Sequence, residues 1–141
     1  MATDVGEISV DFELENPVDR EIIERGSGGQ SGVRRARVQG IVDTGAVMLV
    51  LPQNIVERLG LRVQETVVVT YADNRREERP VAGPVTVRIG DRSTRTDCVV
   101  GPPSTEVLVG HIILEALDLI ADCTNRTLMP RTPGYPLLNL L

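Results

Sequence analysis

The residue best placed to do chemistry in this sequence is Asp43, which lies between two apolar segments and is followed by Thr44 and Gly45. A carboxylate between two buried strands costs free energy unless it is paired or hydrogen-bonded. A turn at Gly45 and the Thr44 hydroxyl could supply those hydrogen bonds, and the acid would then be a candidate general acid or base. Asp, Thr and Gly are also common turn formers, so the tripeptide alone more often indicates a structural hairpin turn.

Composition excludes several other kinds of catalysis. All 15 basic residues are Arg, which removes Schiff-base chemistry, a P-loop lysine and a Ser-Lys dyad. The single His, His111, cannot form a His-rich zinc site, and we expect a hydrogen-bonded structural role at the start of a helix. Cys98 and Cys123 lie in no C-x-x-C motif, so we expect reduced core or strand residues and not a redox pair. Catalysis by this chain would therefore rest on carboxylates, a thiol or backbone groups.

Charge and hydropathy narrow the range of partners. The formal net charge of -5 argues against a nucleic acid partner, and one Phe with no Trp makes a base-stacking surface improbable. No segment approaches the ~20 apolar residues of a membrane helix. Residues 1–10 lack the basic flank and apolar run of a signal peptide. We expect a cytoplasmic protein with no membrane partner.

The elements that must position Asp43 are mostly strands. Residues 6–16 alternate, with Ile8, Val10, Phe12 and Leu14 on one face, which is typical of a half-buried strand. Further strands are expected at residues 33–42, 47–51, 63–71, 77–81, 85–89, 94–100, 106–109, 119–121 and 127–129. Two short helices are expected at residues 52–60 and 112–119. The pattern predicts one all-β domain over residues 1–141, with a flexible loop at 26–32 and an irregular tail at 132–141.

Three features in order carry a family resemblance. The first is Val42-Asp43-Thr44-Gly45-Ala46, followed by an apolar strand that ends at Pro52. The second is a hairpin centred on residues 71–75. The third is Val107-Leu108-Val109-Gly110, followed by a short helix. Over roughly residues 36–130 the chain resembles the retropepsin-like aspartic proteases, and most of all their stand-alone, non-viral members.

The resemblance implies a closed β-barrel or sandwich with a flap hairpin, and roles for the matching positions. Asp43 would be the catalytic carboxylate, Thr44 would link two subunits beneath the active site, and Gly45 would let the substrate backbone approach. Ala46 would leave room beside the acid, and Gly110 would let its strand cross under the catalytic loop. The flap that closes over a peptide would be Tyr71, Ala72, Asp73, Asn74 and Arg75.

One chain carries a single Asp-Thr-Gly, whereas this chemistry needs two carboxylates, so the resemblance implies a homodimer with Asp43 from each chain. It implies an aspartic endopeptidase that hydrolyses peptide or protein substrates without a metal or cofactor.

The chain also departs from the family pattern. Asn74 stands where flaps usually have Gly, and Val47 and His111 replace an Asp and an Arg that pair in viral members. These departures favour an alternative, a catalytically silent dimerisation or peptide-binding module with the same fold. A third possibility is an unrelated β-barrel with a chance Asp-Thr-Gly turn. The apolar tail residues Leu137-Leu138 and Leu140-Leu141 are expected to pack against a partner.

Overall fold

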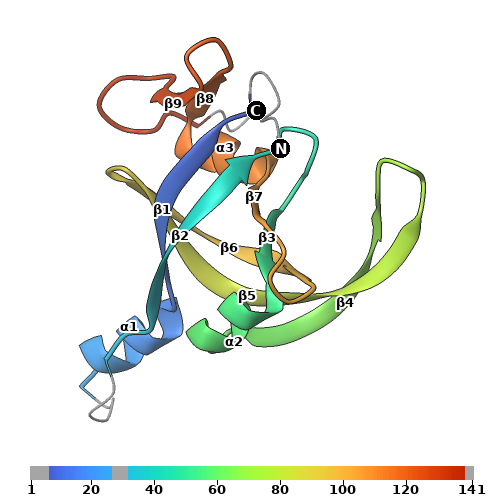
Figure 1. The fold of residues 1–141 in the computed structure, drawn as a ribbon. Helices are drawn as coiled ribbons and strands as arrows, with labels where there is room; N and C mark the ends of the chain where they lie inside the picture. Colours follow the sequence, from blue (N-terminus) through green and yellow to red (C-terminus); the bar gives the residue numbers. More distant parts are fainter. Residues whose placement is uncertain (1–6, 27–31, 139–141) are drawn as a thin grey trace.

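The computed structural model describes residues 7–26 and 32–138, and Figure 1 shows that strands dominate this part of the chain. Nine strands and three helices occur within these residues. The strands are β1 (Ser9–Glu15), β2 (Arg35–Val42), β3 (Leu49–Pro52), β4 (Arg62–Thr70), β5 (Arg76–Ile89), β6 (Arg92–Gly101), β7 (Val107–Val109), β8 (Leu119–Asp122) and β9 (Thr127–Pro130). The helices are α1 (Pro17–Glu24), α2 (Gln53–Leu59) and α3 (His111–Leu117).

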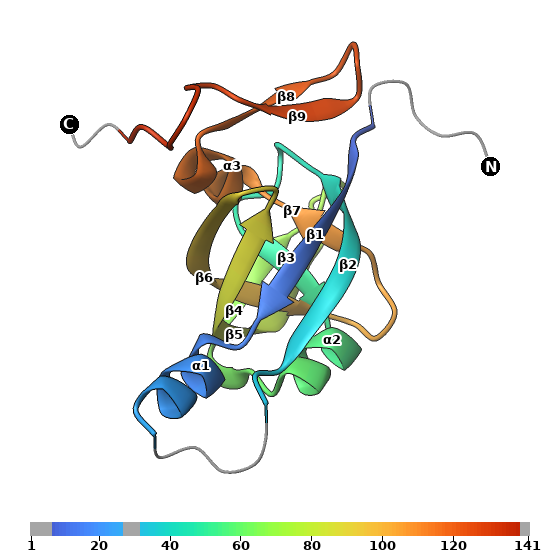
Figure 2. The ribbon, with the colours of Figure 1, turned by 90° about the vertical axis from the view of Figure 1, so that its left-hand side faces the viewer.

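Six strands form a closed barrel. The strand order is β1-β2-β7-β3-β6-β5-β4, and an additional antiparallel pairing joins Glu13–Glu15 of β1 to β5, which closes a ring of β1, β2, β7, β3, β6 and β5. The remaining strand of this sheet, β4, pairs with the first half of β5. β8 and β9 form a separate hairpin beyond α3 (Figure 2).

Alternating apolar side chains fill the barrel. Val85, Val87 and Ile89 of β5 are buried as the period of two predicts, and Phe12 and Leu14 of β1 lie in the same cluster. α2 and α3 contribute Leu59 and Leu117 to it. With one Phe and no Trp in the chain, the core consists almost entirely of aliphatic side chains.

The expected all-β fold is confirmed, with differences in detail. The segments 77–81 and 85–89 form one continuous strand, β5, because a register shift between Ala82 and Val85 absorbs the Gly83-Pro84 interruption. Val47 was expected in a strand but lies in the loop before β3, where its carbonyl accepts a hydrogen bond from the Ile112 amide at 3.0 Å. Of the expected loop at 26–32, residues 27–31 lie outside the described part of the chain.

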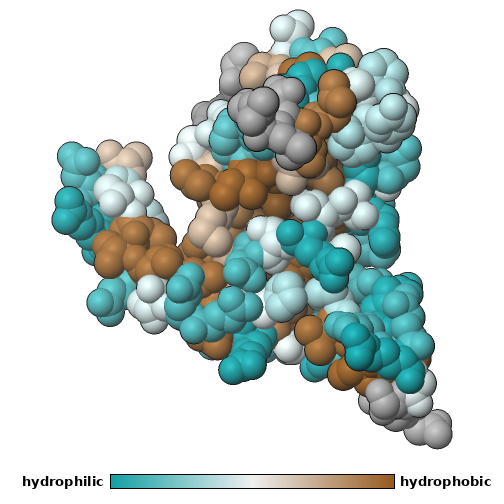
Figure 3. Space-filling view, turned by 180° about the vertical axis from the view of Figure 1, so that it is seen from behind, coloured by the Kyte–Doolittle hydropathy of each residue, from teal (hydrophilic) through white to brown (hydrophobic). Residues whose placement is uncertain are grey.

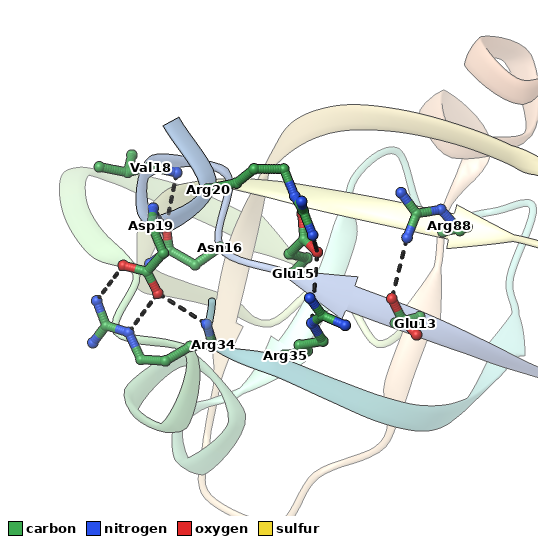
Figure 4. Close-up of polar contacts among 9 residues, drawn as sticks. All are labelled: Glu13, Glu15, Asn16, Val18, Asp19, Arg20, Arg34, Arg35 and Arg88. Atoms are coloured by element: carbon green, nitrogen blue, oxygen red, sulfur yellow. Dashed lines mark hydrogen bonds and ion pairs between the residues drawn. The ribbon is translucent and has the colours of Figure 1, made fainter. Parts of the chain in front are cut away.

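The expectation of two helices is wrong, because α1 is a third. The Asn16 side chain caps it by accepting hydrogen bonds from the amides of Val18 and Asp19, at 2.9 and 3.1 Å, and Pro17 occupies its first turn. The Arg20 guanidinium donates to Glu15 at 2.6 and 2.7 Å, so α1 is fixed to the end of β1 (Figure 4).

Glu15, the last residue of β1, is a charged residue that is only 3% exposed. Arg20 and Arg35 both lie against its carboxylate. The hydrogen bonds from Arg20, helped by the positive charges of the neighbouring Arg residues, lower the pKa of Glu15 despite its burial. The ion pairs therefore explain why this acid can be buried.

The segment after β9 is also fixed, although the sequence predicts an irregular tail. Asp118, at the end of α3, is 1% exposed, and its carboxylate accepts hydrogen bonds from the Arg131 side chain and the Leu137 amide. The buried Arg92 donates to the carbonyl of Thr132 in the same segment. Residues 131–137 are thus held against the barrel, while Leu140 and Leu141 lie outside the described residues. None of the described helices is long and apolar enough to cross a membrane.

Candidate active site

Asp43 lies in the loop between β2 and β3, at the end of the barrel where β2 and β7 both finish. β2 and β7 run parallel, with Val42 beside Val109, so their carboxyl ends meet there (Figure 1). The Asp43 amide donates to the Val109 carbonyl at 3.0 Å, and the Asp43 carbonyl accepts from the Ala46 amide at 3.1 Å. The backbone of Asp43 is therefore fixed both by its own turn and by β7, which is distant in the sequence.

The Asp43 side chain is half-buried and points into its own turn. One carboxylate oxygen, Oδ1, accepts a hydrogen bond from the Gly45 amide at 3.0 Å. The Thr44 side chain is exposed and supplies no hydrogen bond to this acid within the described part of the chain, so only Gly45 fulfils the expectation that the turn would bind it. The other oxygen, Oδ2, has no hydrogen-bond partner among the described residues and could accept from a partner group.

Gly110 permits close packing beneath this loop. A Cβ at Gly110 would clash with the Met48 carbonyl and would lie 2.9 Å from the Ala46 carbonyl oxygen. Immediately after it, the amides of His111 and Ile112 at the start of α3 donate to the carbonyls of Ala46 and Val47, at 2.8 and 3.0 Å. Gly110 and α3 thus hold the backbone of the Asp43 loop from below.

The segment 71–75 forms the tip of the β4–β5 hairpin. The Tyr71 amide donates to the Arg75 carbonyl and the Asn74 amide to the Tyr71 carbonyl, both at 2.9 Å. Asn74 has a φ of 67°, as its residue type predicts. The Arg75 guanidinium lies 4.4 Å from the centre of the Tyr71 ring, and Ala72 and Asp73 are exposed. The tip is thus a closed turn stabilised by a cation-π contact.

The hairpin extends away from the barrel. Figure 3 shows a hollow between it and the rest of the molecule, with apolar residues on both sides of the hollow. β4 carries three consecutive valines, Val67, Val68 and Val69, of which Val68 is 62% exposed. An extended hairpin that exposes apolar residues in the described part of the chain has room to move relative to the barrel.

Arg79 contributes to the position of this hairpin, and sequence reasoning missed it. Its guanidinium donates to the Val100 carbonyl of β6 at 2.8 Å and pairs with Glu77 at 3.0 Å. It therefore ties the base of the hairpin to the barrel. No local pattern signals this, because the partner carbonyl lies 21 residues away.

The other chemistry-bearing residues do not gather near Asp43. Burial raises the pKa of the Cys98 thiol to about 12, so this core residue is no nucleophile. Cys123 was expected in the core or a strand but is exposed in the β8–β9 turn. His111 begins α3 as expected, and its imidazole lies 3.2 Å from the Glu115 carboxylate. Within residues 7–26 and 32–138, no three His, Cys, Asp or Glu side chains are grouped to hold a metal.

Val47 and His111, where viral relatives carry an ion pair, are both exposed. Val47 is 63% exposed and cannot pair with a charge, while His111 turns to Glu115 on its own helix. The two positions remain adjacent through the hydrogen bond between the Val47 carbonyl and the Ile112 amide. These two positions therefore form no ion pair with each other.

An acid in a tight Gly-containing turn at the end of a closed barrel, crossed beneath by a second Gly, defines the retropepsin class of aspartic protease folds. The model of the family described as gag-polyprotein putative aspartyl protease matches residues 31–116, which is more than half of the chain. The chain belongs to this family.

Solved structures similar to the chain include the EIAV protease complexed with the inhibitor HBY-793. That protease is 22% identical over 55% of this chain and 74% of its own, with a TM-score of 0.45. No curated protein matches the chain.

Proposed function

We propose that this protein is an aspartic endopeptidase that works as a homodimer, with Asp43 from each chain forming the catalytic pair. The observation that carries the proposal is the Asp43 carboxylate, which is half-buried and oriented through Oδ1 by the Gly45 amide, and whose Oδ2 accepts no hydrogen bond from residues 7–26 or 32–138. Membership of an aspartyl protease family supports it. A single acid of this kind lacks its partner carboxylate, and a two-fold axis beside the exposed Thr44 would supply one.

The paired carboxylates would share one proton, because two carboxylates about 3 Å apart do not both ionise. The ionised member would take a proton from a water molecule as that water attacks the peptide carbonyl, and the protonated member would donate to the carbonyl oxygen. This is the general behaviour of aspartic-protease pairs. Activity should therefore rise and fall around the pH range in which the pair carries one proton.

Two surfaces support a second copy as the partner. Val47 and Ile112 are 63% and 43% exposed beside the Asp43 loop. The held C-terminal segment carries Tyr135, Leu137 and Leu138, which are 75%, 56% and 54% exposed. Large apolar side chains on fixed segments are costly in water and favour burial in an interface.

In this proposal the β4–β5 hairpin is the flap, and peptide lies between it and the Asp43 loop. The hollow of Figure 3, with apolar residues on both sides, fits a peptide with apolar side chains. Gly45 and Ala46 leave space for the peptide backbone next to the acid, because neither has a side chain beyond Cβ.

The experiment compares wild type with Asp43→Asn on a diverse peptide mixture from pH 3 to pH 8, with cleavage sites read by mass spectrometry. Asn keeps the shape and the Gly45 hydrogen bond but cannot share a proton. The matched control is Asp91→Asn, at an exposed turn between β5 and β6. Cleavage by wild type and the control, but not by Asp43→Asn, is expected. Cleavage that persists in Asp43→Asn would exclude the assignment.

The second candidate is a silent peptide-binding or dimerisation module. The closed hairpin tip at Asn74 and the loss of the ion pair at Val47 and His111 favour it. Absence of cleavage at every pH, together with saturable binding of peptides by wild type and Asp43→Asn alike, would establish this module instead of the enzyme.

A further inference from the structure

A groove of about 510 Å³ lies beside β2, outside the Asp43 loop. One wall is β2, with Val38, Gln39 and Ile41, and the opposite wall is the segment 104–107 that leads into β7. The start of α2 forms the floor at one end. Figure 2 shows these elements together, with β2 next to the segment before β7 and α2 below.

The β2 edge in this groove lacks a partner strand. β1 pairs with β2 from Arg35 to Ile41, whereas β7 pairs with its other edge only from Gly40 to Val42. Residues 35–39 therefore have no strand on that side in the described part of the chain. An open edge presents N–H and C=O groups that an added extended chain can satisfy. The groove thus suits an extended peptide better than a compact ligand.

The side chains that line the groove are partly apolar and partly acidic. Ile41 and Ile55 are half-buried and give an apolar surface. Glu7 and Glu106 add two carboxylates from different elements, and neither forms an ion pair with any described Arg or His. Gln39 is an exposed residue of the same lining. A cationic side chain beside an apolar one is the complementary ligand.

The outer wall of the groove is already ordered. The Ser104 amide donates to the Asn54 side chain at the start of α2 at 3.0 Å, and the Thr105 hydroxyl donates to the Pro102 carbonyl at 2.8 Å. The first bond fixes the segment before β7 to α2, and the second stabilises the turn of the segment itself. A preformed wall lowers the entropy cost of binding.

We infer that this groove binds an extended peptide segment in which Arg or Lys flanks an apolar side chain, and that the segment belongs to the substrate. The inference rests on the proposed function. Ile41 lines the groove only two residues before Asp43, which is about 7 Å along an extended strand. A substrate bound at Asp43 can therefore extend into the groove, which would make Glu7 and Glu106 specificity-determining residues.

The test measures binding without turnover, in the Asp43→Asn protein. Fluorescein-labelled ten-residue peptides share one apolar centre and carry two Arg, two Gln or two Glu beside it, and anisotropy gives their Kd at low and high salt. The Arg peptide should bind most tightly and the Glu peptide least. Adding Glu7→Gln or Glu106→Gln should raise the Kd of the Arg peptide by about two- to five-fold. Adding Gln39→Lys should raise the Kd of the Arg peptide and lower the Kd of the Glu peptide.

The matched control is Glu57→Gln, an exposed acid on α2 outside the groove, which should leave all three Kd values unchanged. Equal binding of the Arg and Glu peptides would overturn the inference, as would equal effects of Glu106→Gln and Glu57→Gln. A tenfold gain in affinity on deleting residues 1–6 would also overturn it, because the chain's own N-terminus would then be the occupant.

Cleavage assays separate this inference from the proposed function. One outcome is wild-type cleavage that is lost in Asp43→Asn but shows no preference for Arg near the cleaved bond. It would support the proposed protease activity and overturn the inference that the groove binds the substrate. Charge-dependent binding without any cleavage would show that the groove binds peptides. It would overturn both the proposed protease activity and the inference that the bound segment belongs to a substrate.

Discussion

Asp118 shows how a single buried acid can hold a segment in place. Its side chain accepts hydrogen bonds from the Leu137 amide and the Arg131 guanidinium, and the Thr132 side chain, the largest influence on its pKa, favours the charged form as well. These partners lower the pKa of Asp118 to about 2, from an ordinary value of 3.8, against the opposing effect of desolvation. The carboxylate therefore holds residues 131–137 more strongly in its ionised form.

Because the folded-state pKa of Asp118 is lowered, its stabilisation is complete above about pH 4 and is lost as the pH falls toward 2. We expect Asp118→Asn to lower the melting temperature at pH 7, with a gap to wild type that narrows between pH 4 and pH 2. Calorimetry of both proteins from pH 7 to pH 2 measures this difference in melting temperature. Asp91→Asn, at an exposed turn, serves as the control and should show little change. A gap that stays constant to pH 2 would contradict the lowered pKa.

Gly110 is a position where even one methyl group is too large. Gly110→Ala would push a Cβ into the Met48 and Ala46 carbonyls, so we expect the free energy of unfolding to fall by about 1–3 kcal/mol. Any cleavage activity should fall with it, because the same carbonyls belong to the Asp43 loop. Gly32→Ala, where no described residue has an atom within 4 Å of the added Cβ, should behave like wild type in denaturant titrations. Equal stability of the two variants would contradict this reading.

The sequence predicted the conformation of single residues where neighbouring residue types determine it. Asp43, Gly45 and Asn74 lie in turns that their residue types favour. Arg79 and Asp118 were not predicted in their roles, because both depend on partners 13 to 21 residues away. Such contacts form only when the sheet has been assembled, and a single sequence does not reveal them.

Among the elements, the β4–β5 hairpin is the one whose motion matters most for a bound peptide. Its tip requires a positive φ at Asn74, which Gly adopts without cost and a β-branched residue resists by about 1–2 kcal/mol. We expect Asn74→Gly to leave the fold intact and Asn74→Val to open the tip. Hydrogen exchange should then be faster in residues 66–80 for Asn74→Val alone, while β1 and β6 serve as internal references. Uniform exchange across both variants would show that Asn74 does not hold the turn.

The strands were more predictable than α1. The second half of β5 buries Val85, Val87 and Ile89 and leaves the residues between them more exposed, and this gives a period of two in the sequence. β6 instead ends in a run of buried residues, 98–101, which the sequence shows as a short apolar segment. α1 buries only Pro17 and leaves Val18, Ile22 and Ile23 40–46% exposed, so no core-facing stripe distinguishes it. The Asn16-Pro17 pair was a usable signal, because Asn favours the cap and Pro the first turn of a helix.

For the whole molecule, the central prediction is that activity belongs to two chains together. If each active site needs Asp43 from both copies, mixing wild type with a ninefold excess of Asp43→Asn chains, followed by exchange, should reduce activity to about a tenth. The mixed dimers contain one Asn and cannot share the proton. An equal excess of Asp91→Asn chains should not inhibit. Undiminished activity in the first mixture would mean that one chain is sufficient.

The closed ring has a consequence for how the chain acquires its structure. β1 joins β5 about 70 residues further along, and β2 joins β7 at a similar separation. Loop closure over such distances is entropically costly and slows folding. During synthesis, β1 and β2 can pair early, but the ring stays open until β7 has left the ribosome. Until then, the edges of β2 and β3 and the interior side chains remain unprotected, so this nascent chain should depend on chaperones more than a helical protein of equal length.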